Sequence, residues 1–337
     1  MKNILVIFLA LFGATTLCHA QACYFCSHEW TSSRADGHAP IGVMGDHTHQ
    51  SGEWMFSYRY INMNMDGNRE GTSRLSPSEV LKDYMVTPTD MDMEMHMLGA
   101  MTAPTDWLTL TFMLPFVDLS MNHQTRSGGR FKTEASGLGD IRVNSLFRVF
   151  DQMSQRVHLS AGVSLPSGEI DERDDTPTMS DAKLPYPMQL GSGTVDLLPG
   201  ITYLGQYESF SWGGQASGTL RLGENDNDYT LGNRFDATAW AAYQPVQELS
   251  VSFRTLWQSW GDIDGSDPDL SPALISTADP TKRGGERLDL GVGINLFLPS
   301  MKSLRLAVEY LFPVYQDLNG PQLEVDSTIV VGAQMTF

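Results

Sequence analysis

An alternation of apolar and polar residues with a period of two is the feature that most constrains this chain. The pattern recurs from residue 54 to residue 337. Residues 107–117, for example, place leucine or phenylalanine at every second position, with threonine or methionine between most of them. Successive side chains of a strand point to opposite faces, so each such segment predicts a strand with one apolar and one polar face. The chain is therefore predicted to be all-β, with about 12 antiparallel strands, an even number.

The connections between the predicted strands alternate between short turns and longer polar loops. Residues 103–106 and 151–156 are short turns, whereas residues 66–90 and 168–190 are long loops. Short turns at one rim and long loops at the other are typical of an outer-membrane barrel, and they favour it over a water-soluble sandwich. No internal segment reaches the roughly 18 apolar residues of a membrane-spanning helix, which excludes a helical membrane protein. We therefore predict a single transmembrane β-barrel over residues 52–337.

The last segment of the chain is an amphipathic strand that ends on Phe337. Such a terminal aromatic residue resembles the signal read by the outer-membrane assembly machinery, although a soluble β protein could also end on phenylalanine. We expect the assembly machinery to be a partner through Phe337. The expected location is the bacterial outer membrane, in contact with its lipid and lipopolysaccharide.

The first 22 residues have the pattern of a secretory signal peptide, with Lys2 before an apolar stretch and small residues at 20–22. Residues 23–51 would then form a histidine-rich periplasmic segment or a plug. The mature segment contains Cys23 and Cys26, which in an oxidising compartment are predicted to form a disulfide. A metal or redox role for the two cysteines is the alternative.

The charge balance bears on the partners and on the polar strand faces. The chain has 40 Asp and Glu against 22 Lys and Arg, for a net charge of −18, which argues against nucleic acid as a partner. The polar strand faces nevertheless carry both signs and are expected to line the lumen, where opposite charges can pair. The predicted lumen-lining residues are Arg59, His96, Asp140, Arg142, Arg148, Arg254, Arg287, Asp289, Arg305 and Glu309.

Residues 91–97 alternate methionine with acidic residues and histidine. A charge facing lipid near the bilayer midplane costs about 2–4 kcal/mol. We therefore expect Asp92, Glu94 and His96 to face the lumen and the four methionines of this stretch to face lipid.

Several glycine-containing phrases lie at residues 136–141, 165–168 and 191–200. They resemble the outer-membrane proteins grouped as the putative meta-pathway phenol-degradation family. Residues 38–49 (HAPIGVMGDHTH) are in addition similar to the opening of proteobacterial outer-membrane barrels labelled only as transporters. The resemblance implies an outer-membrane barrel that passes a small-molecule solute, with an aromatic compound suggested by the family name. It implies no catalytic residue.

A group of possible metal ligands precedes the first predicted strand. Met44, Asp46, His47 and His49 lie close together, and imidazole with thioether favours copper. The alternative is that these side chains make ordinary hydrogen bonds within a plug. Acidic loops at residues 169–175 and 262–279 could hold Ca²⁺ or Mg²⁺, or could simply be solvated.

Enzyme motifs are not found: the chain contains no Gly-x-Ser-x-Gly elbow, phosphate loop or His-Glu-x-x-His stretch. Asp118, Ser120 and His123 are close in sequence, but nothing places the histidine as a base for the serine. We predict no enzyme activity and no catalytic or organic-cofactor site. The leading function is a porin-like channel or transporter for a small solute, with a copper-handling barrel as the alternative. A structural or adhesive barrel without transport is a third class.

Overall fold

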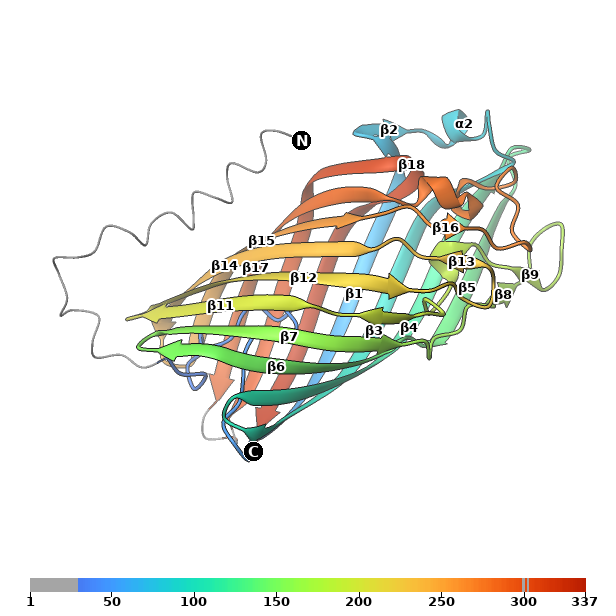
Figure 1. The fold of residues 1–337 in the computed structure, drawn as a ribbon. Helices are drawn as coiled ribbons and strands as arrows, with labels where there is room; N and C mark the ends of the chain where they lie inside the picture. Colours follow the sequence, from blue (N-terminus) through green and yellow to red (C-terminus); the bar gives the residue numbers. More distant parts are fainter. Residues whose placement is uncertain (1–29, 299–300, 302) are drawn as a thin grey trace.

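The computed structural model describes residues 30–298, 301 and 303–337, and nearly all of its regular structure is strand (Figure 1). The predicted signal peptide (1–22), Cys23 and Cys26 lie outside the described residues. The wall strands are β1 (Trp54–Gly71), β3 (Val86–Thr105), β4 (Leu108–Thr125), β6 (Ile141–Gln152), β7 (Gln155–Leu165), β11 (Gly200–Tyr207), β12 (Phe210–Leu222), β14 (Arg234–Val246), β15 (Leu249–Trp260), β17 (Gly285–Leu298) and β18 (Leu304–Thr336). Shorter elements are β2 (Ser73–Leu75), α2 (Pro77–Val80), β5 (Arg130–Leu138), β8 (Arg173–Asp174), β9 (Ala182–Lys183), η2 (Tyr186–Met188), β10 (Val195–Leu197), β13 (Tyr229–Thr230), β16 (Asp264–Gly265), η3 (Ser276–Ala278) and η4 (Pro280–Lys282).

The wall strands pair with one another in antiparallel order around a closed ring. Pairing of β1 with β18 and of β12 with β14 completes the ring. The residues labelled β18 form two arms of a hairpin: residues 304–318 pair with β17, and residues 318–336 pair with β1. The eleven labelled wall strands therefore make twelve when the two arms of β18 are counted separately, which confirms the predicted all-β barrel. Closure pairs the backbone groups of neighbouring strands, as a strand that crosses lipid requires.

The outer face of the barrel is apolar. Trp54, Phe112 and Val292 are 48%, 43% and 51% exposed, whereas the inward Thr109 and Thr111 are buried. This distribution is the reverse of that in a water-soluble protein and is typical of a barrel surrounded by lipid. Among the described residues, no helix is long and apolar enough to cross a membrane.

The two rims differ as the sequence predicts. At one rim, Asp106 and Trp107 alone separate β3 from β4. At the other, residues 72–85 join β1 to β3, and residues 166–194 join β7 to β10. In outer-membrane barrels the short turns face the periplasm and the long loops face the exterior. Strand β1 therefore begins at the periplasmic rim and ends at the extracellular rim.

Candidate functional site

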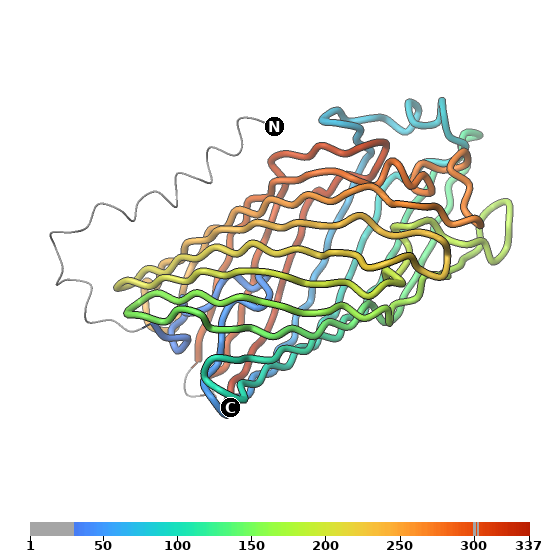
Figure 2. Tube along the Cα trace, viewed as in Figure 1, coloured from blue at the N-terminus to red at the C-terminus, as the bar shows by residue number. Residues whose placement is uncertain are grey.

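A segment that precedes the first strand lies inside the barrel. Residues 30–49, which we call the plug, lie within the ring of strands near the periplasmic rim (Figures 1 and 2). Hydrogen bonds to the plug come from side chains of β1, β4, β6, β7, β11, β12, β15 and β18. The plug is thus held from most sides of the barrel.

Charged side chains of the wall bind the backbone of the plug. The Arg305 guanidinium donates to the carbonyl oxygen of Ala35 at 2.9 Å. Arg59 donates to the carbonyl oxygen of Ile41 at 3.0 Å. Both arginines are 5% exposed or less, so these bonds are made out of contact with bulk water. Charged groups inside this barrel therefore hold a chain segment in addition to pairing with one another.

Gly42 marks the closest approach of the plug to the wall. Its N–H donates to the Glu309 carboxylate at 2.8 Å, and Glu309 also pairs with Arg254 at 3.2 Å. A Cβ at position 42 would lie 2.6 Å from the Glu309 Oε2 atom and 2.7 Å from the Arg254 Nη1 atom. A side chain at this position would displace this buried ion pair or push the plug away from it, and this favours glycine.

Apolar contacts complete the attachment of the plug. Trp30 and Val43 pack against the inward-facing Leu204 and Trp240. Ile41 packs in a second cluster formed by side chains of β18. The plug therefore has its own small hydrophobic core, shared with the barrel wall.

Most residues predicted to line the lumen do point inward. The inward-pointing members are Arg59, Arg142, Arg148, Arg254, Arg287, Asp289, Arg305 and Glu309. The expected pairing of opposite charges is seen for Arg254 with Glu309 and for Arg287 with Asp289 at 3.0 Å. Arg148 instead donates to the carbonyl oxygen of His49 in the plug.

Asp140 differs from this group. It lies in the link between β5 and β6, where its carboxylate accepts hydrogen bonds from the N–H groups of Gly168 and Ser192 at 3.1 and 2.9 Å. The residue therefore fixes the backbone of the 166–194 loop instead of pairing across the lumen.

The prediction for residues 91–97 is wrong. His96 is paired with Tyr60 on the outer face, which also carries the 49% exposed Leu98, whereas Met91 and Met97 point inward and are buried. The charges of Asp92 and Glu94 are tolerated outside because the neighbouring outward residues of β4 toward the extracellular rim are polar as well. The cost of an outward charge applies only within the hydrocarbon layer.

Seven of the inward methionines of β1, β3 and β4 form what we call the methionine strip. Its members are Met63, Met65, Met91, Met93, Met95, Met97 and Met121. Met65, Met91 and Met121 are direct neighbours across three strands at the extracellular end. Leu184 and Met188 of the 166–194 loop pack against this end, so the loop folds over the mouth of the barrel.

A cavity lies between the plug and the wall. Its volume is about 120 Å³, and it is bounded by Met44 and Gly45 of the plug and by Met113, Arg142 and Asp236 of the wall. The Arg142 side chain borders this cavity and is exposed to solvent. The lumen beside the plug is therefore accessible to solvent.

Extracellular loops are joined above the lumen by an ion-pair cluster. Lys183 in β9 is 2.7 Å from Asp171 and 2.6 Å from Asp267, and its side chain is only 4% exposed. Burial opposes its charge, but the hydrogen bonds to both carboxylates raise the pKa of Lys183. This cluster ties the 166–194 loop to the loop that carries Asp267. It also neutralises part of the acidic groups that the sequence offers as possible Ca²⁺ or Mg²⁺ ligands.

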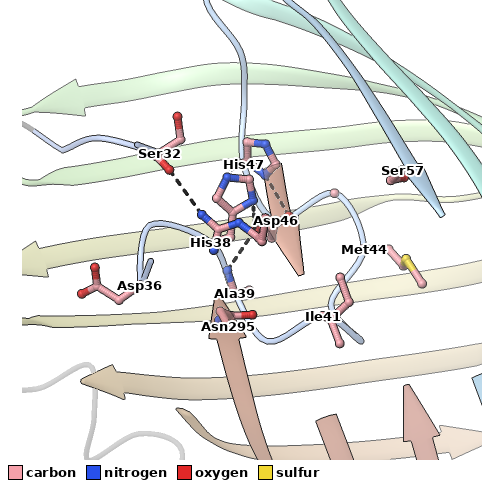
Figure 3. Close-up of polar contacts among 12 residues, drawn as sticks. Ser32, Asp36, His38, Ala39, Ile41, Met44, Asp46, His47, Ser57 and Asn295 are labelled. Carbon is pink, nitrogen blue, oxygen red and sulfur yellow. Dashed lines mark hydrogen bonds and ion pairs between the residues drawn. The ribbon is translucent and has the colours of Figure 1, made fainter. Parts of the chain in front are cut away.

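Three histidines of the plug, His38, His47 and His49, lie side by side. Figure 3 shows His38 and His47 with Asp46. The ring centroids of His38 and His47 are 3.9 Å apart, and those of His47 and His49 are 4.8 Å apart. The Asp46 carboxylate is 2.8 Å from the His47 Nδ1 atom and 3.8 Å from the His38 Nδ1 atom. One ligand atom from each of His38, Asp46 and His47 fits within 4.8 Å of the others.

These imidazoles are buried, and burial lowers the pKa of His38 and His49. His38, His47 and His49 are 8%, 0% and 3% exposed. Burial, together with the nearby charges of Arg305 and His47, lowers the pKa of His38 well below its usual value. Burial likewise lowers the pKa of His49 to about 4. Neutral imidazole is the form that binds metal ions.

The structure changes the membership of the predicted metal cluster. Met44 lies apart from the imidazoles in Figure 3 and borders the cavity instead. His38 takes its place, because a turn over residues 39–45 returns the chain to it. The sequence places His38 in the same short segment but carries no signal for this turn. The more distant His28 lies outside the described residues.

The residues considered for catalysis are separated in the structure. Asp118 and Ser120 share the outward face of β4, whereas His123 is 3% exposed and hydrogen-bonded to Thr133. The described residues therefore do not bring these three side chains together.

Comparisons with known proteins agree with this architecture. Residues 84–312 match the family described as "Putative MetA-pathway of phenol degradation". An outer membrane channel from Pseudomonas putida F1 is 15% identical, with a TM-score of 0.65 over 88% of this chain and 100% of that chain. A Pseudomonas aeruginosa FadL homologue is 10% identical, with a TM-score of 0.40 over 84% of this chain and 89% of that chain. No curated protein matches the chain.

The closed barrel with its lipid-facing belt places the protein in the bacterial outer membrane, as predicted. The matched residues 84–312 make up more than half of the 337-residue chain. The chain therefore belongs to the family described as "Putative MetA-pathway of phenol degradation".

Proposed function

We propose that this barrel passes a small, mainly apolar solute across the outer membrane, and that aromatic compounds are the preferred class. The methionine strip is the observation that carries the proposal. Thioether sulfur makes favourable contacts with aromatic rings, worth about 0.3–1.5 kcal/mol each. The strip runs from the extracellular mouth along the inner wall, and the family description names phenol degradation.

A passing solute meets a chain segment at each end of the lumen. The plug occupies the periplasmic end, and the 166–194 loop packs on the extracellular end of the strip. We propose that one or both segments move during transport, because their contacts with the wall can break while the strands of the barrel remain paired.

Flux through the purified protein in liposomes tests this proposal. A hydroxylated benzoate, which crosses lipid slowly as an anion, should enter faster than a sugar of similar size. Met95→Lys, which places a charge in the strip, should reduce this flux, whereas Glu94→Lys on the outer face should not. Absence of flux, both in the full protein and after deletion of residues 30–49, would refute a transport role.

Copper passage is the second candidate, because thioethers also bind Cu(I). The inward position of the methionine strip favours it, contrary to the lipid-facing position predicted from the sequence. The same liposomes loaded with a Cu(I)-sensitive dye distinguish the two cargoes. Faster entry of Cu(I) than of the aromatic anion would favour copper.

The chain end has its own proposed partner. Phe337 is 55% exposed, and its backbone is paired with Trp54 at the periplasmic rim. We propose that the assembly machinery binds this residue before the barrel closes. Phe337→Ser should slow assembly in cells while leaving refolding in detergent unchanged.

A further inference from the structure

We propose that His38 and His47, whose ligand atoms lie within 4.8 Å of each other, bind one copper ion inside the plug together with the adjacent His49, and that Asp46 and Glu53 orient the imidazoles. The inference goes beyond the proposed transport function, because it concerns a fixed site in the plug and not the passing solute. It rests on the positions of the side chains within residues 38–53.

The carboxylates leave one ring nitrogen of each of two imidazoles free for a ligand. The His47 Nδ1 atom is 2.8 Å from Asp46, and the His49 Nδ1 atom is 3.2 Å from Glu53. In each ring the Nε2 atom lies on the far side from this contact and makes no hydrogen bond; we call such an atom a bare nitrogen. A carboxylate that accepts from the far N–H is the usual partner of a metal-bound histidine, because it fixes the ring and the tautomer.

The bare nitrogens have no hydrogen-bond partner among the described residues. His38 Nδ1, His47 Nε2 and His49 Nε2 are all buried without a hydrogen bond. A buried polar atom left unpaired costs about 1–3 kcal/mol. Three such atoms on adjacent rings would therefore destabilise a plug that binds no ligand. By contrast, the nearby His158 is hydrogen-bonded to the carbonyl oxygen of Gly45 at 2.9 Å.

The surrounding charges are compatible with a divalent cation. Asp46 lies directly beside the rings, and Glu53 contacts His49. Arg305 is near His38 and opposes a cation, but its guanidinium is bound to backbone carbonyl oxygens of the plug. Two carboxylates therefore lie at the rings, and the nearest arginines, Arg305, Arg148 and Arg59, each donate to backbone carbonyl oxygens of the plug.

Copper is the favoured ion on chemical grounds. Imidazole ligands suit zinc, copper and nickel, and Cu²⁺ binds most tightly of the divalent first-row ions to a given nitrogen site. His38 lies before the turn that carries Ile41 and Gly42, and His47 and His49 lie after it. A bound ion would thus join the two ends of this turn. It would therefore also fix the part of the plug that contacts Arg59 and Glu309.

Titration of the metal-free full-length protein in detergent with Cu²⁺ tests the site. We expect one tightly bound ion per chain, with an electron paramagnetic resonance spectrum showing nitrogen couplings from more than one imidazole. His47→Ala should weaken binding by more than about 100-fold, since loss of an orienting partner alone costs about 10–100-fold. Asp46→Asn, which removes an orienting partner, should weaken copper binding by about 10–100-fold.

His123→Ala is the matched control, because His123 is also buried with one unpaired ring nitrogen but has no second imidazole beside it. It should bind copper as the unaltered protein does. His38→Ala is a second ligand variant. Amide exchange of residues 30–49 shows whether each variant keeps its plug in place, so that lost binding is not confused with release of the plug. The proposal is overturned if the unaltered protein binds no ion tightly, or if His38→Ala and His47→Ala, with the plug in place, bind as the control does. Liposome flux is measured separately, so either proposal can fail alone.

Discussion

Removal of the Glu309 carboxylate should loosen the plug without unfolding the barrel. Glu309 is 1% exposed and accepts the Gly42 N–H at 2.8 Å. In Glu309→Ala, this N–H loses a charged acceptor inside the barrel. The effect should be local, because the neighbouring strands remain paired through their backbones.

The size of the effect follows from the lost bond. A hydrogen bond to a charged group contributes about 1.5–3 kcal/mol. Each 1.4 kcal/mol changes an equilibrium constant about tenfold, so docking of the plug should weaken by about 10- to 100-fold. Arg254 would lose its partner as well, and this loss adds to the destabilisation of the wall around the plug.

Hydrogen–deuterium exchange of peptides from residues 30–49 measures this change. Glu324→Ala is the matched control, since Glu324 is 2% exposed and paired with arginines but lies near the extracellular end of β1, away from the plug. Faster exchange of the plug in Glu309→Ala alone is the expected result. Equal exchange of the plug in both variants would refute the assignment of Glu309 as an anchor.

Three other changes have defined outcomes. Lys183→Met should destabilise the loop over residues 166–194 by about 3–5 kcal/mol, because it leaves a buried carboxylate unpaired, and single-channel conductance should rise. Gly42→Ala should displace the plug at a cost of about 1–3 kcal/mol, measured by amide exchange, and unchanged exchange would contradict the close approach. Val292→Arg on the lipid-facing side should cost up to about 2–4 kcal/mol in denaturant titrations of the refolded protein in bilayers, whereas Glu94→Arg should cost about 0–1 kcal/mol. Equal costs would contradict the assigned belt.

The periodicity of the sequence was sufficient for the barrel and for most inward positions. Alternation along β17 and β18 placed Arg287, Arg305 and Glu309 on one face, and the structure confirms that face as the interior. Strand geometry is local, so side-chain direction follows from the chain itself once one face is known to meet lipid.

The methionine strip shows where periodicity was insufficient. Alternation separated Met93 and Met95 from Asp92 and Glu94, but it could not say which set faced inward. That choice depends on height in the membrane, because an outward carboxylate is costly in hydrocarbon and acceptable above it. Height is set by the pairing of all strands around the ring, which a single segment does not contain.

The sequence and the tertiary structure each determined part of the histidine cluster. The sequence by itself placed Asp46, His47 and His49 together, since they are near neighbours on one short segment. Only the tertiary structure added His38 and removed Met44, because the turn over residues 39–45 takes its shape from contacts with the barrel wall. Contacts between distant parts of the chain, and not local preference, decided which side chains share this site.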